Sequence, residues 1–298
     1  MPRNLKKLDF SSFAVQLKEL VSSQLGEEFE LYLHTVTKNN GGSREGIVVR
    51  KKEERVTHSI YLERYYKKYI KNMELETIAV EFIQAYRQAA QNNLPEAEML
   101  EDFDKIRDNI FFRLVNYQKN EIILSDIPFL PFLDLTITFH CLVQNKMDYI
   151  SSLRITNHHL ELWGINIKKL TEVAKDNTPR IFPASIRTME EIFRGFSLAT
   201  EEDVNPMYVV SNNTGINGAS CLLYKDVISV LAGELNSNLF ILPSSIHEII
   251  VMKDDGFIGK EELAQMVKEV NLTQVAEEDF LSDSVYYYSA DEQRIIKA

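Results

Sequence analysis

The chain has 298 residues, of which 45% are hydrophobic and 26% charged, and its 33 basic and 44 acidic side chains give a formal net charge of -11. This length and apolar content suit one large domain or two modest ones, which excludes intrinsic disorder, collagen-like repeats and small disulfide scaffolds. The acidic balance disfavours non-specific binding to nucleic acids or anionic membranes as the main activity.

Hydrophobic periodicity predicts alternating helices and strands in the first 114 residues. Gly26 ends the first helix, and the residues tolerant of positive φ at 39–42 join the first two strands. Pro95 suits the first turn of a helix, and helically spaced apolar residues continue from there to Leu114, which predicts the last helix of this part. The expected elements are a helix at 12–25, strands at 29–33, 46–50 and 59–62, and helices at 75–89 and 95–114.

Strict alternation over residues 133–143 predicts the clearest strand of the chain. Shorter elements follow, separated by polar turns, and residues 178–185 are expected to be irregular because of Pro179 and Pro183. The expected helices are 156–164, 168–176, 189–193, 226–235 and 260–270. The expected strands are 207–211, 219–224, 238–242, 246–252 and 284–288.

This order of elements predicts an α+β fold with mixed or antiparallel sheets and flanking helices. Many strands are too close in sequence for the crossover helices that a doubly wound parallel sheet needs. A boundary is expected between residues 121 and 131. We therefore expect two modules, an N-terminal one over 1–125 and a C-terminal one over 126–298.

The charge is distributed unevenly along the chain. Residues 1–72 contain 14 basic and 9 acidic side chains, whereas residues 73–298 contain 19 basic and 35 acidic ones. The simplest interpretation is a solvated basic patch, and the alternative is contact with an acidic partner or, less favoured, a nucleic acid. The basic residues concerned are Arg50, Lys51, Lys52, Arg55, Lys67, Lys68 and Lys71.

Cys141 and Cys221 are the only two cysteines, and both fall in apolar or alternating segments, so we expect them to be buried small side chains. The basic residues 1–7 are not followed by an apolar run of signal-peptide length. No stretch approaches the roughly 18–20 apolar residues that cross a bilayer. These features predict a cytoplasmic protein without membrane contact.

The common nucleotide-binding, zinc-protease and serine-hydrolase motifs are absent from the sequence. Gly215 and Gly218 form only a G-x-x-G in a loop, which is typical of a turn, and no compact Cys/His cluster occurs. We therefore expect neither a cofactor nor a metal ion, and leave open whether the protein is an enzyme.

The segment Leu242-Pro243-Ser244-Ser245-Ile246-His247-Glu248 gathers two hydroxyls, an imidazole and a carboxylate. Ser245 and His247 would share a face of a strand, whereas Glu248 would point to the opposite one. The favoured interpretation is a turn stabilised by hydroxyls with a partly buried histidine. The alternatives are a serine nucleophile with His247 as its base, or a dispersed metal site that includes His140 and His247.

A second polar group lies near the C-terminus. Asn271 suits the end of a helix, and Asp283 suits a turn before the strand that contains Tyr286, Tyr287 and Tyr288. Packing is the favoured role of these residues, and an aromatic and acidic recognition surface for a peptide or small ligand is the alternative.

Several of these strings occur together in a family of uncharacterised bacterial proteins of about this length, which the sequence resembles over most of its extent. The matching segments are 60–66, 127–135, 217–219, 242–248, 266–276 and 281–288. The resemblance implies a cytoplasmic bacterial protein. It implies no reaction, cofactor or catalytic residue.

These observations predict a non-catalytic binding or regulatory module with an unidentified protein or small-molecule partner. The alternative is a hydrolase with a Ser/His or His-containing metal site around Ser245 and His247. The candidate surface lies in the C-terminal module and consists of Ser244, Ser245, His247, Glu248, Asn271 and Asp283.

Overall fold

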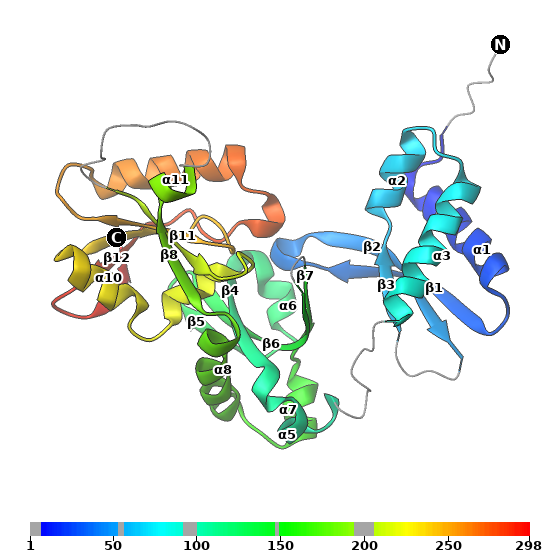
Figure 1. Cartoon of the computed structure of the whole chain (residues 1–298), viewed down its shortest axis with the longest axis horizontal. Coiled ribbons are helices and arrows are strands. Elements are labelled where there is room, and N and C mark those ends of the chain that lie inside the picture. The colour runs from blue at the N-terminus through cyan, green and yellow to red at the C-terminus, as the bar shows by residue number, and fades with distance from the viewer. Residues whose placement is uncertain (1–6, 53–56, 92–99, 147–148, 194–205) are drawn as a thin grey trace, which may run out of the picture. The chain divides into compact units, whose positions relative to one another are not determined.

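The computed structural model describes residues 7–52, 57–91, 100–146, 149–193 and 206–298 (Figure 1). The chain divides into two compact units, which we describe separately. Unit 1 comprises residues 1–38 and 42–100, and unit 2 comprises residues 39–41 and 101–298. The boundary expected at 125/126 falls inside unit 2, and the compact units divide instead at residue 100.

The described residues of unit 1 form an antiparallel sheet in the order β1-β2-β3 and the helices α1, α2 and α3. The first helix begins at Asp9, whose carboxylate accepts a hydrogen bond from the Ser12 amide at 2.7 Å, and it ends at Gly26 with φ 95°. The elements are α1 (Phe10–Leu25), β1 (Phe29–Thr37), β2 (Ser43–Lys51), β3 (His58–Tyr61), α2 (Glu63–Ile70) and α3 (Leu75–Gln91).

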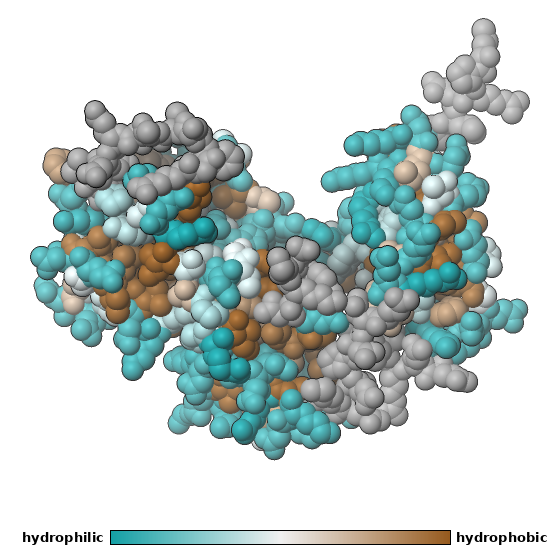
Figure 2. Space-filling model, viewed as in Figure 1, coloured by the Kyte–Doolittle hydropathy of each residue, from teal (hydrophilic) through white to brown (hydrophobic). Residues whose placement is uncertain are grey.

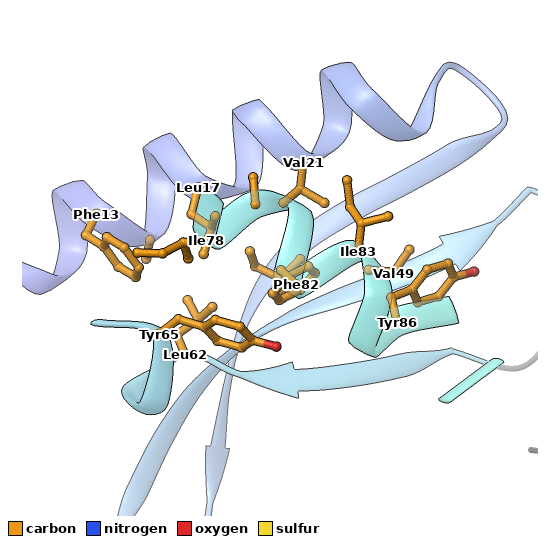
Figure 3. Close-up of a cluster of buried hydrophobic side chains, with 13 residues drawn as sticks. Phe13, Leu17, Val21, Val49, Leu62, Tyr65, Ile78, Phe82, Ile83 and Tyr86 are labelled. Atoms are coloured by element: carbon orange, nitrogen blue, oxygen red, sulfur yellow. The ribbon is translucent and has the colours of Figure 1, made fainter. Parts of the chain in front are cut away.

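Apolar side chains of α1 and α3 meet those of the sheet to form the core of unit 1, as Figure 3 shows. Phe13 and Leu17 of α1, Phe82 of α3 and Ile47 of β2 have no solvent-exposed surface. The 3.6-residue spacing of these positions on each helix explains why one face is buried and why the periodicity predicted both helices correctly.

The first sheet of unit 2 is built around the long strand β6. β4 lies along one side of β6, and β5 and β7 pair with its other side in succession, all antiparallel. The strands are β4 (Ile110–Asn116), β5 (Phe129–Phe132), β6 (Leu135–Lys146) and β7 (Tyr149–Arg154), and the associated helices are α5 (Phe103–Ile106), α6 (Glu121–Leu124), α7 (Asn157–Trp163) and α8 (Ile167–Ile181).

The outer edge of β4 is occupied by side-chain hydroxyls. The Phe112 amide donates to the Thr178 hydroxyl at 3.1 Å, and the Leu114 amide donates to the Ser220 hydroxyl at 3.3 Å. Buried backbone donors need partners, and these two hydroxyls supply them where no further strand pairs.

The second sheet of unit 2 has the order β13-β12-β10-β11-β9-β8, and every neighbouring pair is antiparallel. Leu263 and Val267 of the long helix α11 pack on side chains of β10 and β11. The elements are β8 (Ala184–Thr188), α9 (Met189–Phe193), β9 (Tyr208–Asn212), the 3-10 helix η5 (Gly218–Leu223), α10 (Val227–Leu235), β10 (Leu239–Leu242), β11 (Ile249–Lys253), α11 (Lys260–Gln274), β12 (Tyr286–Ser289) and β13 (Arg294–Lys297).

The fold is α+β with antiparallel sheets and flanking helices, as the sequence predicts. Most expected elements are present, but two predictions are wrong. The helix predicted to run to Leu114 stops at Ile106, and residues 110–116 form β4, because this β-branched and aromatic segment pairs with β6. The strand predicted at 219–224 is the 3-10 helix η5.

Smaller differences concern element ends. α8 continues through Pro179 to Ile181, whereas residues 178–185 were expected to be irregular. β11 begins at Ile249 and α11 ends at Gln274, each three or four residues later than expected. Residues 92–99, which include the expected start of the helix at Pro95, lie outside the described residues.

Hydrophilic residues cover most of the face drawn in Figure 2, with hydrophobic areas between them. Both cysteines are buried, as expected. Among the described helices, none combines the length and hydropathy that crossing a bilayer demands.

Gly218 allows the start of η5 to pack directly on β9. A β-carbon at this position would lie 2.1 Å from the Ser211 hydroxyl oxygen, 2.5 Å from the His247 carbonyl oxygen and 2.7 Å from the Asn212 amide nitrogen. Two of these atoms belong to the backbone and cannot rotate away. Only glycine therefore fits here without displacing β9 or the segment at His247.

We expect Gly218→Ala to lower the free energy of unfolding by about 3 kcal/mol or more, because the added methyl group overpacks a backbone contact. Gly233→Ala in α10 is the matched control, since no atom lies within 4 Å of its β-carbon position. Alanine favours a helix over glycine by up to about 1 kcal/mol, so the control should be neutral or stabilising. Urea unfolding followed by circular dichroism measures both, and equal midpoints would contradict the packing argument.

Candidate functional site

The segment that carries Ser244, Ser245 and His247 connects β10 to β11 and lies beside residues 279–282. The Pro243 carbonyl accepts from the Ser282 amide and the Ser244 carbonyl from the Leu281 amide, both at 2.9 Å, and the Ile246 amide donates to the Asp279 carbonyl at 2.8 Å. These bonds hold two segments together that are more than 30 residues apart in sequence.

Both ring nitrogens of His247 are hydrogen-bonded to protein groups. The Asn217 amide donates to Nδ1 at 3.3 Å, and Nε2 lies 3.1 Å from an Asp279 carboxylate oxygen. Because a backbone amide only donates, Nδ1 is the acceptor and the neutral ring carries its proton on Nε2. In this arrangement His247 has no free lone pair with which to accept a proton from a serine.

The hydroxyls near His247 do not contact its ring. Ser245 is buried, and its hydroxyl oxygen accepts a hydrogen bond from the His247 amide at 3.0 Å, which stabilises the turn. Ser244 and Glu248 are partly exposed, and their side chains make no hydrogen bond within the described part of the chain. The turn interpretation of the segment accounts for these contacts, whereas a Ser–His proton relay does not.

Asn271 and Asp283 do come together. The Asn271 amide group donates to the Ser282 carbonyl at 2.9 Å and to the Asp283 carboxylate at 2.8 Å. Asn271 is buried within α11, and its side-chain oxygen has no partner in the described structure. The pair fastens α11 to the turn before β12.

Five of the six predicted residues belong to one backbone segment or contact it, and no printed contact joins Glu248 to it. Ser244, Ser245 and His247 contact residues 279–282 from one direction, and Asn271 binds Ser282 and Asp283. None of the six lines the cavity beside Arg113 or the one between Lys18 and Leu31. Ser244, His247 and Asn271 have in common that they bind residues 277–284.

Sequence reasoning missed the central role of Asp134 in the turn between β5 and β6. Its carboxylate accepts hydrogen bonds from the hydroxyls of Ser282 at 2.7 Å, Ser284 at 2.8 Å and Tyr286 at 2.5 Å, and Lys297 lies 3.8 Å away. Burial alone would raise the pKa of the Asp134 carboxyl, but these three bonds and the lysine charge outweigh it and hold the pKa below 3.8.

Two asparagines from other parts of unit 2 bind the same segment, and a third supports them. Asn40 donates to the carbonyls of Glu277 at 2.8 Å and Phe280 at 2.6 Å, and Asn116 donates to that of Leu281 at 2.9 Å. Asn120 donates to the Asn40 side chain at 3.0 Å. All three asparagines are buried, so each bond satisfies a group that water does not reach.

A second polar cluster, which we call the cationic face, lies on one side of β4, β6 and β7. His140 of β6 stands directly opposite Phe111 of β4 and Arg154 of β7. Arg113 of β4 reaches across β6, because its guanidinium donates to the Ser152 hydroxyl of β7 at 2.8 Å. The cationic face consists of Arg113, Thr138, His140, Ser152 and Arg154.

Burial and mutual repulsion dominate the electrostatics of the cationic face. Burial and then the charge of Arg154 lower the pKa of Arg113 to about 10, and burial lowers the pKa of Arg154. Burial and then both guanidinium charges hold the pKa of His140 well below 6.5, so its ring is neutral at physiological pH. No carboxylate of the described residues pairs with either arginine.

The arginines of this face were missed because Arg113 was placed in a predicted helix. In the strand that the segment forms, a charged residue at an alternating position among apolar ones would have been the signal. Arg154 likewise follows an apolar position at the end of β7.

The remaining candidate groups are the two cysteines and the dispersed metal site. Burial raises the pKa of the Cys141 thiol to about 11 and that of the Cys221 thiol to about 12, which makes both poor nucleophiles. The described residues contain no group of three or more potential metal ligands, and the dispersed metal site at His140 and His247 stays a prediction.

Part of the N-terminal basic segment is paired within unit 1. Arg50 forms an ion pair with Glu30, and Lys68 forms one with Glu81 at 2.5 Å. These pairs reduce the free positive charge of the patch. Arg55 lies outside the described residues.

Comparison with known proteins identifies the family but no function. The chain belongs to a family of unknown function, DUF5688, whose model matches residues 10–290. No curated protein matches the chain. No solved structure matches it either.

We expect Asp134→Asn to lower the free energy of unfolding at pH 7 by about 3 kcal/mol, because three hydroxyls lose a charged acceptor. The folded-state pKa lies below the ordinary pKa of an aspartate, so the carboxylate stabilises the fold above that pKa and loses its effect as the pH falls through the folded-state value. Urea unfolding at pH 7 and pH 3 should show a smaller difference in acid. Asp291→Asn, at an exposed turn, is the control.

His140 should make the fold sensitive to mild acid. Below pH 6.5 the unfolded chain binds a proton at this position and the folded chain does not, so stability falls as the pH drops towards the lower folded-state pKa. Urea unfolding between pH 7 and pH 5 should give His140→Gln a shallower dependence, by up to about 1.4 kcal/mol per pH unit. Parallel curves for the two proteins would contradict the neutral, buried state of the ring.

Proposed function

We propose that the protein is a non-catalytic binding module that contacts its partner through an outer polar surface of unit 2. This surface, the polar turn surface, consists of the outward parts of Ser244, His247, Glu248, Asp279 and Asp283. The observation that carries the proposal is the bonding of His247, whose two ring nitrogens are both held by protein groups. Its imidazole therefore serves to hold a shape rather than to transfer a proton.

The surroundings support a preformed contact surface. Main-chain hydrogen bonds between residues 243–246 and 279–282 hold the backbone, while the side chains of His247 and Asp279 are 31% and 33% exposed. A surface held in this way loses little conformational freedom when a partner binds. The carboxylates of Glu248, Asp279 and Asp283 favour a protein or small molecule that presents basic groups.

The hydrolase alternative needs a serine hydroxyl within hydrogen-bond reach of a free imidazole nitrogen. To provide one, His247 would have to release either the Asn217 amide or Asp279, and the Ser245 hydroxyl would have to leave the His247 amide. No contact in the described structure favours that rearrangement. A cytoplasmic location and a bacterial origin stay predictions from the sequence and the family resemblance.

Partner capture tests the surface. Immobilised wild-type protein and the double variant Ser244→Ala/Glu248→Gln are incubated with cytosol of the source cell, and retained proteins are compared by quantitative mass spectrometry. Ser229→Ala/Glu234→Gln, on α10, is a control with the same residue types. We expect a partner that the control retains and the surface variant loses at least tenfold, and retention by both variants would rule out this surface.

Labelling with a serine-reactive fluorophosphonate tests the absence of catalysis. We expect no labelling of Ser244 or Ser245, because neither hydroxyl has a base to remove its proton. Labelling of either serine that disappears in His247→Ala would overturn the proposal in favour of the hydrolase. Asp279→Asn in the same assay establishes whether the carboxylate assists any labelling of the serines.

A further inference from the structure

The cationic face contains two positive charges that the described residues leave without a counterion. Arg113 donates one hydrogen bond, to the neutral Ser152 hydroxyl, and its guanidinium lies 5.0 Å from the centre of the Phe111 ring. Its Nε is completely buried and has no hydrogen-bond partner in the part of the chain that the structure describes. Within the described residues, Arg154 forms no ion pair or side-chain hydrogen bond. This situation is unusual, because removing an arginine from water without a carboxylate is costly.

The register of the strands brings these charges together. His140 is the cross-strand neighbour of Arg154, and the guanidinium of Arg113 passes diagonally over β6 from the level of Thr138 to that of Ser152. Directly opposed side chains in a sheet are about 4.5–5.5 Å apart at their β-carbons. Each arginine lies close enough to depress the pKa of His140, so all three groups share one region.

We propose that the cationic face binds a dianionic phosphate group, either free phosphate or the phosphate of a small phosphomonoester. The site goes beyond the polar turn surface and does not depend on it. Arg113 and Arg154 bind the phosphate oxygens, and the Ser152 hydroxyl lies beside them as a further donor. Guanidinium groups suit this role because their planar N–H donors match oxyanion geometry and stay charged.

Charge balance selects a dianion over a monoanion. A carboxylate would neutralise one arginine and leave the other uncompensated, whereas a phosphate monoester carries close to two negative charges at neutral pH. Thr138 holds Nε2 of the neutral His140 ring at 3.1 Å. An anion at this position would also raise the pKa of that ring, because it adds the opposite charge that the face lacks.

Hydration alone does not account for the cationic face. The narrow cavity beside Arg113 has a volume of about 10 Å³ and is lined in part by Phe111, Phe182 and Asn217. A cavity of this size holds at most a single water molecule. One water could satisfy the buried Nε but would leave both charges unbalanced, and the cavity is too small for an organic group. The phosphate therefore binds on the partly exposed side of the two arginines.

Isothermal titration calorimetry with inorganic phosphate, and separately with glycerol 3-phosphate, tests the proposal on the full chain at pH 7.5 and constant ionic strength. We expect saturable binding of at least one of these ligands. Arg154→Gln should weaken binding at least tenfold, and Arg154→Lys should retain part of it. Arg154 makes no side-chain hydrogen bond to any described residue, so its replacement leaves no such partner unsatisfied and the variant should fold. Arg294→Gln, at an exposed position of β13, is the control and should bind as the wild type does.

Thermal unfolding separates ligand binding from a structural role of Arg154. Without ligand, Arg154→Gln should melt at the same or a higher temperature than the wild type, because it removes repulsion from Arg113. With phosphate, the wild type and Arg294→Gln should gain stability relative to equal ionic strength of chloride, and Arg154→Gln should not. Binding of glycerol 3-phosphate alone identifies a phosphomonoester as the ligand. Absence of binding to both ligands, or equal binding by Arg154→Gln, overturns the site.

Discussion

Unit 2 depends on the hydrogen bonding of one irregular segment, residues 277–284. The segment lies between α11 and β12 and belongs to no strand. Its one described β-bridge joins Phe280 to Ser245. Its carbonyls therefore need other donors, and the side chains of Asn40, Asn116 and Asn271 provide them. Buried amide and carbonyl groups without partners each cost a few kcal/mol, so these asparagines decide where the segment can lie. Asp134 also fixes the segment, because its carboxylate accepts hydrogen bonds from the hydroxyls of Ser282 and Ser284.

The two polar clusters of unit 2 differ in how completely their bonds are made. Around His247, ring nitrogens and the Ser245 hydroxyl all have protein partners, which is what a structural element requires. On the cationic face, Arg113 keeps a buried donor without a partner and Arg154 has no counterion in the described structure. Unsatisfied buried polar groups are rare in native proteins, and violations of this kind are expected at functional or strained sites. The complete bonding around His247 preforms the polar turn surface, whereas the groups of the cationic face that lack partners are the ones that the proposed phosphate would bind.

Elements whose hydrophobic pattern was regular were predictable from the sequence, and elements selected by distant partners were not. The helices at 10–25 and 75–91 and the strand at 135–146 follow directly from periodicity. Residues 110–116 contain apolar positions compatible with a helix or a strand, and pairing with β6 decides between them. The division into units differs from the expected one for a related reason, because β4 belongs with β6 and therefore carries the start of unit 2 back to residue 101.

The sequence by itself determined the α+β class, the burial of both cysteines, the turn character of the segment at Ser244 and the family to which the chain belongs. Only the tertiary structure decided which polar groups meet. His247 binds Asn217 and Asp279, which are 30 and 32 residues away, and Arg113 reaches Ser152 over 39 residues. Hydrophobic periodicity in the sequence indicates which face of an element is buried. Contacts between distant polar side chains depend instead on strand register and on the order of strands in a sheet. A single sequence does not encode that order in any short stretch, because sheet pairing is a property of segments far apart in the chain.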